Sequence, residues 1–263
     1  MKHILVLVDF TDTADIALDQ AIAFAKEQNA LITTCHIAGA NTDKDSLMTE
    51  MRSYAERAES QGVENKVLIG HGDFFDEVGS IIDRLGPDLI VVGTHGKHGI
   101  KQNLFGSAIH KLVKEAKAPT LVVNDHSKVS PKGYRKVLMP VAPHKDYLVK
   151  VEQTCQVLAD DGEIVIFALL KPGVPLDEDI ISNVEATKKY LDGRGVSYVY
   201  QEEDSDRYSV GYSKETISYV QKQDMDLISI MANVSDRNQL FGKMDKENVL
   251  LNELGIPVLC ANH

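Results

Sequence analysis

The 263-residue chain lacks the sequence features of secreted, disulfide-bonded and membrane-spanning proteins. Its three cysteines, Cys35, Cys155 and Cys260, lie far apart and form no C-x-x-C pair. We therefore expect buried, reduced thiols. No apolar run approaches the ~20 residues that span a bilayer. The apolar run that follows Met1 is too short for a secretory signal and ends at Asp9. We expect a cytoplasmic protein.

Positive charge is also scarce. The chain has 28 Lys and Arg residues against 39 Asp and Glu residues, a net charge of −11. Nucleic-acid binding needs a basic face, and anionic membranes attract basic segments. The sequence therefore predicts neither partner. One segment differs, because Gly93 to Lys114 contains no acidic residue and four lysines, which favours a phosphate ligand. These lysines are Lys97, Lys101, Lys111 and Lys114.

Short apolar runs alternate with helical patterns along the chain. Ile4–Val8 and Asp88–Val92 are typical of buried parallel strands, and Thr13–Gln28 has apolar residues at helical spacing. Strands that alternate with helices form right-handed crossovers, with helices on both faces of a parallel sheet. The sequence therefore predicts an α/β fold.

The pattern restarts after a polar stretch with Pro and Gly at 124–133, which is typical of a linker. Lys136–Val141 resembles the first strand, and Tyr147–Ala159 resembles the first helix. A period of about half the chain is too long for a solenoid repeat. We predict two tandem domains, at residues 1–127 and 134–263.

The last strand of each domain supports the duplication. Lys117–Val123 resembles Leu254–Cys260, and each segment ends in a short apolar run. The final strands, Thr120–Val123 and Pro257–Cys260, would each leave an exposed apolar sheet edge. We therefore expect the two domains to pack against each other through these strands, as an internal pseudo-dimer.

The most specific signal is the spacing G-x2-G-x9-G-S formed by Gly93, Gly96, Gly106 and Ser107. It follows the strand Asp88–Val92 and precedes a predicted helix. Glycines at a strand exit let the backbone approach a ligand closely. A Gly-Ser step that opens a helix presents free N–H groups to an anion. The motif therefore favours a phosphate site over a loop of ordinary turn glycines.

These residues resemble the universal stress protein family, in two copies that cover the chain. The glycine motif, Asp9 after the first strand and Ala118-Pro119 before the fifth carry the resemblance. The resemblance implies two Rossmann-like domains of the adenine nucleotide alpha hydrolase type, each with a parallel sheet of order 3-2-1-4-5. It also implies ATP or AMP, with or without Mg²⁺, at the carboxyl ends of strands 1 and 4.

The resemblance implies roles for individual residues. Val8 and Ile37 would approach the adenine, and Asp9 would hold the ribose or lie near the base. The ribose and phosphates would lie along the glycine segment, at Gly93, Thr94, His95, Gly96, Gly106, Ser107 and Ala108. No catalytic residue and no metal ligand is assigned. Asp9 as a turn or helix cap, and Ser107 as a helix cap, are alternatives that stay open.

The second copy departs from the motif. Met231 and Val234 stand where the first copy has Gly93 and Gly96, and Ala142 stands in place of Asp9. The larger side chains would occupy space that a ribose or phosphate needs. We predict that this domain does not bind ATP in the same way.

The expected function is regulation in a stress response. Nucleotide binding would order the segment from Gly93 to Gly106 and change a surface that a protein partner reads. A slow ATPase or nucleotidyl transferase is one alternative, although no Walker A lysine motif is present. A scaffold with a vestigial pocket or another small ligand is a second alternative. The sequence leaves a homodimer of the chain open.

Overall fold

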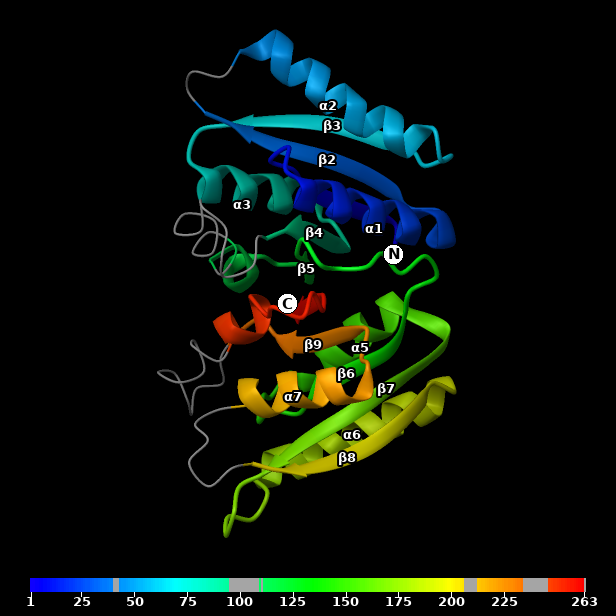
Figure 1. Ribbon diagram of the computed structural model, residues 1–263, viewed down its shortest axis with the longest axis vertical. Coiled ribbons are helices and arrows are strands. Elements are labelled where there is room, and N and C mark those ends of the chain that lie inside the picture. The colour runs from blue at the N-terminus through cyan, green and yellow to red at the C-terminus, as the bar shows by residue number, and fades with distance from the viewer. Residues whose placement is uncertain (40–42, 95–108, 110, 206–211, 234–245, 263) are drawn as a thin grey trace.

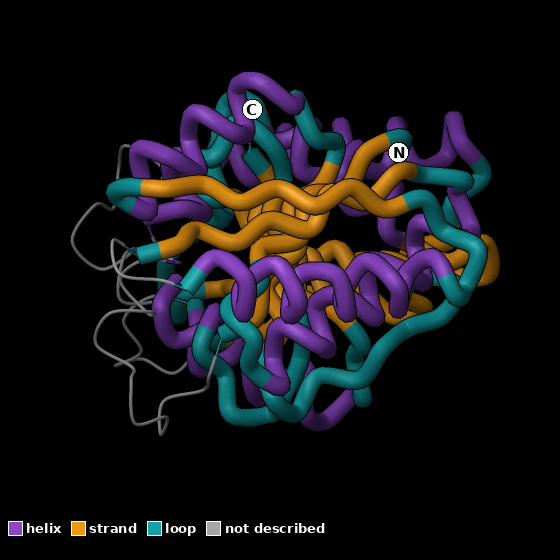
Figure 2. Tube along the Cα trace, turned by 90° about the horizontal axis from the view of Figure 1, so that it is seen from above, coloured by secondary structure: helices purple, strands orange, loops and turns teal. Residues whose placement is uncertain are grey.

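The structure is a computed structural model that describes residues 1–39, 43–94, 109, 111–205, 212–233 and 246–262. They form one ten-stranded sheet of order β3-β2-β1-β4-β5-β10-β9-β6-β7-β8. Figure 1 shows the first half of the chain (β1 to β5) above the second half (β6 to β10), and Figure 2 shows helices on both sides of the strands. The predicted α/β class with a mostly parallel sheet is confirmed.

The first half closely follows the predicted pattern. Its strands are β1 (His3–Leu7), β2 (Leu31–Ala38), β3 (Asn65–His71), β4 (Leu89–Gly93) and β5 (Thr120–Val123). Its helices are α1 (Asp12–Gln28), α2 (Lys44–Glu59) and α3 (Phe74–Leu85), and residues 111–115 are also helical. The central strands β1 and β4 are short apolar runs that are almost entirely buried.

The second half repeats this arrangement. Its strands are β6 (Tyr134–Pro140), β7 (Leu158–Leu170), β8 (Ser197–Asp204), β9 (Leu227–Met231) and β10 (Val258–Ala261). Its helices are α5 (Tyr147–Val157), α6 (Glu178–Arg194) and α7 (Ser213–Gln223), and residues 246–250 are also helical.

The predicted end of the first helix in this half is wrong. The helical pattern continues to Ala159, but α5 ends at Val157, and Leu158 is extended with φ −74° and ψ 140°. Leu158 already pairs with Tyr134 at the start of β6. Pairing with a distant strand therefore ends the helix, and no local helix-breaking residue marks the place.

The two halves join through an antiparallel pair, whereas all other strand pairs are parallel. In this seam between β5 and β10, Val258 pairs with Val122, Leu259 with Leu121 and Cys260 with Thr120. The pairing agrees with the expectation that neither apolar edge would stay exposed.

The hydrophobic core forms two layers, one on each face of the sheet. One layer contains residues of α1, α2, α5 and α6, and the other contains residues of α3, α7 and the helical residues near 112 and 250. Each layer draws side chains from both halves of the chain. The halves therefore share their core as well as their sheet.

Two buried asparagines extend the seam with reciprocal hydrogen bonds. The Asn124 Nδ2 donates to the Asn252 carbonyl oxygen at 3.0 Å. The Asn262 Nδ2 donates to the carbonyl oxygens of Val113, at 3.1 Å, and Ala116. Each asparagine follows the last strand of its own half and binds the end of the last helix region of the other half.

The remaining general expectations concern cysteines and membranes. All three cysteines are free, but only Cys35 and Cys260 are buried, whereas Cys155 is half-buried. Burial raises the pKa of the Cys35 and Cys260 thiols to about 12. Among the described residues, every helix is too short or too polar to cross a bilayer.

Candidate functional site

The candidate site lies at the carboxyl ends of β1, β2 and β4, three neighbouring parallel strands. Val8 follows β1 and donates its N–H to the Cys35 carbonyl at 2.9 Å. Thr94 follows β4 and donates its N–H to the Val123 carbonyl at 2.7 Å. Ligands of open α/β sheets bind at this edge, where the order of the strands reverses.

Half of the predicted site residues fall within the described chain. The structure brings these residues to one edge of the sheet: Val8, Asp9, Ile37, Gly93 and Thr94. The other predicted residues lie outside the described residues: His95, Gly96, Gly106, Ser107 and Ala108. Their roles stay predictions.

Asp9 closes the turn that leads into α1. Its Oδ1 accepts hydrogen bonds from the Thr11 hydroxyl at 2.5 Å and the Thr11 N–H at 3.3 Å. The Thr11 and Thr13 hydroxyls are 3.0 Å apart. The alternative role of Asp9 as a turn residue is therefore present in the structure. These bonds end on one carboxylate oxygen, and a carboxylate has two acceptor oxygens. Turn closure and ligand binding are compatible.

Gly93 allows α1 to begin very close to β4. A Cβ atom at Gly93 would lie 2.6 Å from both the carbonyl carbon and the oxygen of Thr13. Any other residue would push the first turn of α1 away from the sheet. The glycine motif predicts only ligand approach at Gly93, and nothing in the local sequence indicates this packing role.

An aromatic cluster beside Val8 was also missed. The Phe10 ring lies 4.6 Å from the His36 ring and 5.9 Å from the Tyr54 ring, between ring centroids. The His36 Nδ1 is 2.8 Å from the Val8 carbonyl oxygen, which can only accept, so Nδ1 carries the proton. Phe10 has a positive φ of 61°, unusual for a bulky residue. This conformation places an apolar wall next to the predicted adenine position.

The equivalent edge of the second half carries different side chains. Val141 and Ala232 make the same backbone bonds as Val8 and Thr94, to the carbonyls of Phe167 at 2.8 Å and Ala261 at 2.7 Å. This register places the buried Met231 at the position of Gly93. That this half binds no nucleotide in the same way stays a prediction.

Two buried lysines lie at this second edge. The Lys150 Nζ donates to the carbonyl of Pro140, the last residue of β6, at 2.5 Å. The Lys246 Nζ donates to the Ala232 carbonyl, just after β9, at 2.7 Å. Burial and then the charge of Lys246 lower the pKa of Lys150. Burial lowers the pKa of Lys246 to about 8. Nothing in the sequence pattern indicated that these side chains are buried.

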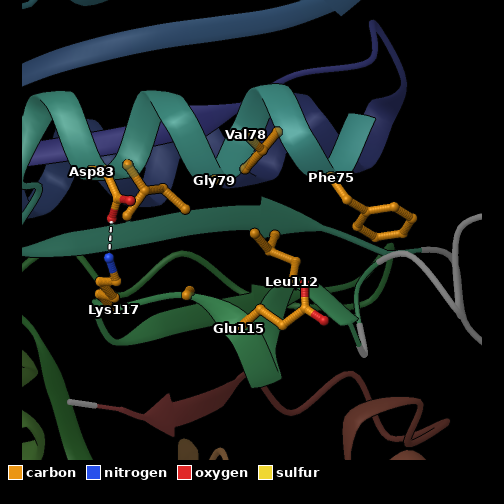
Figure 3. Close-up of a pocket in the computed structure, with 9 residues that line it drawn as sticks. Phe75, Val78, Gly79, Asp83, Leu112, Glu115 and Lys117 are labelled. Atoms are coloured by element: carbon orange, nitrogen blue, oxygen red, sulfur yellow. Dashed lines mark hydrogen bonds and ion pairs between the residues drawn. The ribbon is translucent and has the colours of Figure 1, made fainter. Parts of the chain in front are cut away.

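A small cavity of about 90 Å³ lies between α3 and the helical residues 111–115. Figure 3 shows Phe75 at one end and the Asp83–Lys117 ion pair, at 2.7 Å, at the other. Nucleotide pockets are several hundred cubic ångströms. The cavity is too small for the predicted ligand. In the described parts of the chain, no group of three His, Cys, Asp or Glu side chains could hold a metal ion.

Comparison with known proteins identifies the family that the first half resembles. The sequence model of the Universal stress protein family matches residues 1–124. Universal stress protein YxiE of Bacillus subtilis is 28% identical over 145 residues, which cover 46% of this chain and 98% of that protein. Universal stress protein MJ0577 of Methanocaldococcus jannaschii is 27% identical over 152 residues, which cover 46% of this chain and 94% of that protein.

A solved structure resembles the whole chain. The universal stress protein of Archaeoglobus fulgidus DSM 4304 superposes with a TM-score of 0.74 and 15% identity, over 99% of this chain and 96% of that one. At this identity the likeness shows the fold alone. The fold is therefore a mostly parallel, Rossmann-like sheet shared with a universal stress protein, and residues 1–124 match the family in sequence.

Proposed function

We propose that the chain is a tandem universal stress protein whose first half binds one adenine nucleotide. The domains are residues 1–127 and 134–263, each with strand order 3-2-1-4-5. Two facts support the duplication: the curated relatives are covered almost completely by 46% of this chain, and the topology of β1 to β5 recurs in β6 to β10.

The observation that carries the nucleotide proposal is the position of Gly93 at the carboxyl end of β4, beside β1. Gly93 is the first glycine of G-x2-G-x9-G-S, so the motif starts at the edge where open α/β sheets bind ligands. In the proposal the base lies near Val8 and Ile37, and Asp9 contacts the ribose. The remaining motif residues bind the phosphates through backbone N–H groups.

Calorimetric titration of the full chain with ATP and with AMP tests this proposal. We expect close to one site per chain. Gly106→Val should abolish binding, because the added side chain blocks approach of the phosphates. Gly242→Val, the matched change in the second copy, should leave the affinity unchanged. Two equal sites per chain, or binding that survives Gly106→Val, would contradict the proposal.

The regulatory part of the proposal concerns what binding changes. We propose that nucleotide slows hydrogen exchange in the segment from Gly93 to Gly106, and that a cytoplasmic protein partner reads this surface. A ligand shifts such an equilibrium only through its different affinity for the two states. Hydrogen exchange with and without ATP measures the effect. Equal exchange in both samples would remove the regulatory part and leave binding itself intact.

A further inference from the structure

A bare backbone position near the carboxyl ends of β2 and β3 brings two side chains together. Gly70 of β3 pairs with Ile37 of β2. A Cβ atom at Gly70 would lie 2.6 Å from both the Ile37 Cδ1 and the Glu77 Cγ, and 3.1 Å from the Glu77 Oε1. The side chains of Ile37 and Glu77 therefore meet above Gly70, in space that any other residue would occupy.

The start of α3 positions Glu77 over these strand ends. Glu77 lies in the first turn of the helix, and the turn is capped by the Asp73 side chain. The Asp73 Oδ1 accepts hydrogen bonds from the N–H groups of Phe75 and Asp76 at 2.9 Å and 3.3 Å. Burial and then the negative charge of Glu77 raise the pKa of the Cys35 thiol in β2. The carboxylate of Glu77 is therefore close to β2 and half-buried against the sheet.

The geometry points to Glu77 as the residue that selects adenine, by accepting a hydrogen bond from the 6-amino group of the base. This inference rests on the proposed function, in which Ile37 contacts the base, and it adds the chemical group that the protein recognises. Because the Glu77 Oε1 and the Ile37 side chain lie against the same backbone position, a base on Ile37 comes within reach of the carboxylate.

The chemistry of a carboxylate matches an exocyclic amine. An ionised carboxylate only accepts hydrogen bonds, and it offers two oxygens. Adenine carries a donating amino group at position 6, where guanine carries an accepting oxygen that a carboxylate repels. Hydrogen bonds to an ionised acceptor are roughly twice as strong as neutral ones. One such bond is enough to set a preference for the base.

The second half has the acid but not the bare backbone position. The pairing of β4 with β1 recurs in β9 with β6, and this register places Glu215 at the position of Glu77. The pairing of β2 with β3 recurs in β7 with β8, and it places Glu203 at the position of Gly70. Both oxygens of the Glu215 carboxylate are buried. The arrangement that would recognise a base is therefore specific to the first half.

Calorimetric titration of the full chain with ATP, and with the triphosphate of purine riboside, tests this inference. The second ligand lacks only the 6-amino group. We expect wild-type protein to bind ATP about tenfold more tightly or better, the range of one hydrogen bond to a charged group. Glu77→Met keeps the length of the side chain and removes both acceptor oxygens, so the preference should fall below about twofold. Asp76→Met, at an exposed carboxylate in the same helical turn, is the matched control and should keep the full preference.

Gly70→Ala tests the same contact from β3. The new Cβ atom would displace the Glu77 carboxylate, so the preference for ATP should fall as it does in Glu77→Met. Both variants should bind the purine riboside triphosphate as wild type does, which shows that the fold and the phosphate contacts are intact.

The outcomes separate this inference from the proposed function. Equal binding of the two triphosphates by wild type would overturn the inference and leave nucleotide binding intact. A preference that survives in both Glu77→Met and Gly70→Ala would also overturn it, and so would tighter binding of GTP than of ATP. If wild type bound none of these triphosphates, the proposed function would be wrong, and this inference with it.

Discussion

Each half of the molecule has an equivalent edge at the carboxyl ends of its strands, and the two edges carry different residues. In the first half, Gly93 and Ala17 let α1 lie close to the strands, and aromatic rings stand beside Val8. In the second half, Met231 and Lys150 take those two positions and are buried. The comparison teaches that strand order alone does not determine the ligand. In the proposed function, the side chains at a few positions of the edge would select the ligand.

The largest expected effect comes from Gly93→Ala, which would make the first edge more like the second. The new Cβ would lie 2.6 Å from the Thr13 backbone, so α1 must shift. We expect a loss of about 3 kcal/mol in the free energy of unfolding, the upper end of overpacking costs. Urea denaturation measures this loss.

Gly79→Ala is the matched control for Gly93→Ala. Gly79 lies inside α3, and a Cβ atom there would meet nothing within 4 Å. We expect this change to stabilise the protein by about 0.5–1 kcal/mol, since alanine favours helices. If both alanine variants behaved alike, the packing role of Gly93 would be refuted.

The second expected effect tests how the two halves are held together. Asn262→Ala removes donors to the buried carbonyls of Val113 and Ala116, and we expect a loss of about 2 kcal/mol. Hydrogen exchange should rise in residues 111–116 of the first half. Gln28→Ala removes an exposed bond to the Gln156 carbonyl, and it should cost less than about 0.5 kcal/mol. Unchanged exchange at 111–116 would show that Asn262 does not stabilise the other half.

The smallest expected effect is a pH-dependent gap between wild type and Lys246→Met in chloride buffer. The folded pKa of Lys246, about 8, lies below its usual 10.5, so the unfolded chain binds more protons between these values. Wild-type stability should rise relative to Lys246→Met as the pH increases from 8 to 10.5. Below pH 8 the variant should be more stable, by on the order of 1 kcal/mol. A gap that stays constant across this range would contradict the burial of a charged Lys246.

Local patterns in the sequence predicted helices and strands, and they predicted the edge of the sheet where the candidate site lies. Apolar runs such as Asp88–Val92 indicated buried strands, and the glycine spacing beginning at Gly93 marked a strand end that the structure places beside β1. The exposed-edge argument predicted the pairing of β5 with β10. These features follow from short stretches of chain and from general rules of sheet construction.

Contacts between residues far apart in the chain could not be predicted from the sequence. The approach of Thr13 to Gly93 joins residues eighty positions apart, and Asn262 binds carbonyls in the other half. Lys150 lies in a helical pattern where a lysine is ordinarily exposed, so its burial has no local signal. Side-chain convergence of this kind depends on how helices pack onto the sheet.

The antiparallel seam between β5 and β10 has a consequence for how the halves evolved. Three residues of β5 face three of β10 as two identical strands would across a two-fold axis. A lone half would therefore offer the same free backbone groups to a second copy of itself. In the proposed tandem chain, fusion would replace that concentration-dependent encounter with a permanent neighbour. Once the two copies are encoded separately, one can keep its glycines while the other accepts lysines.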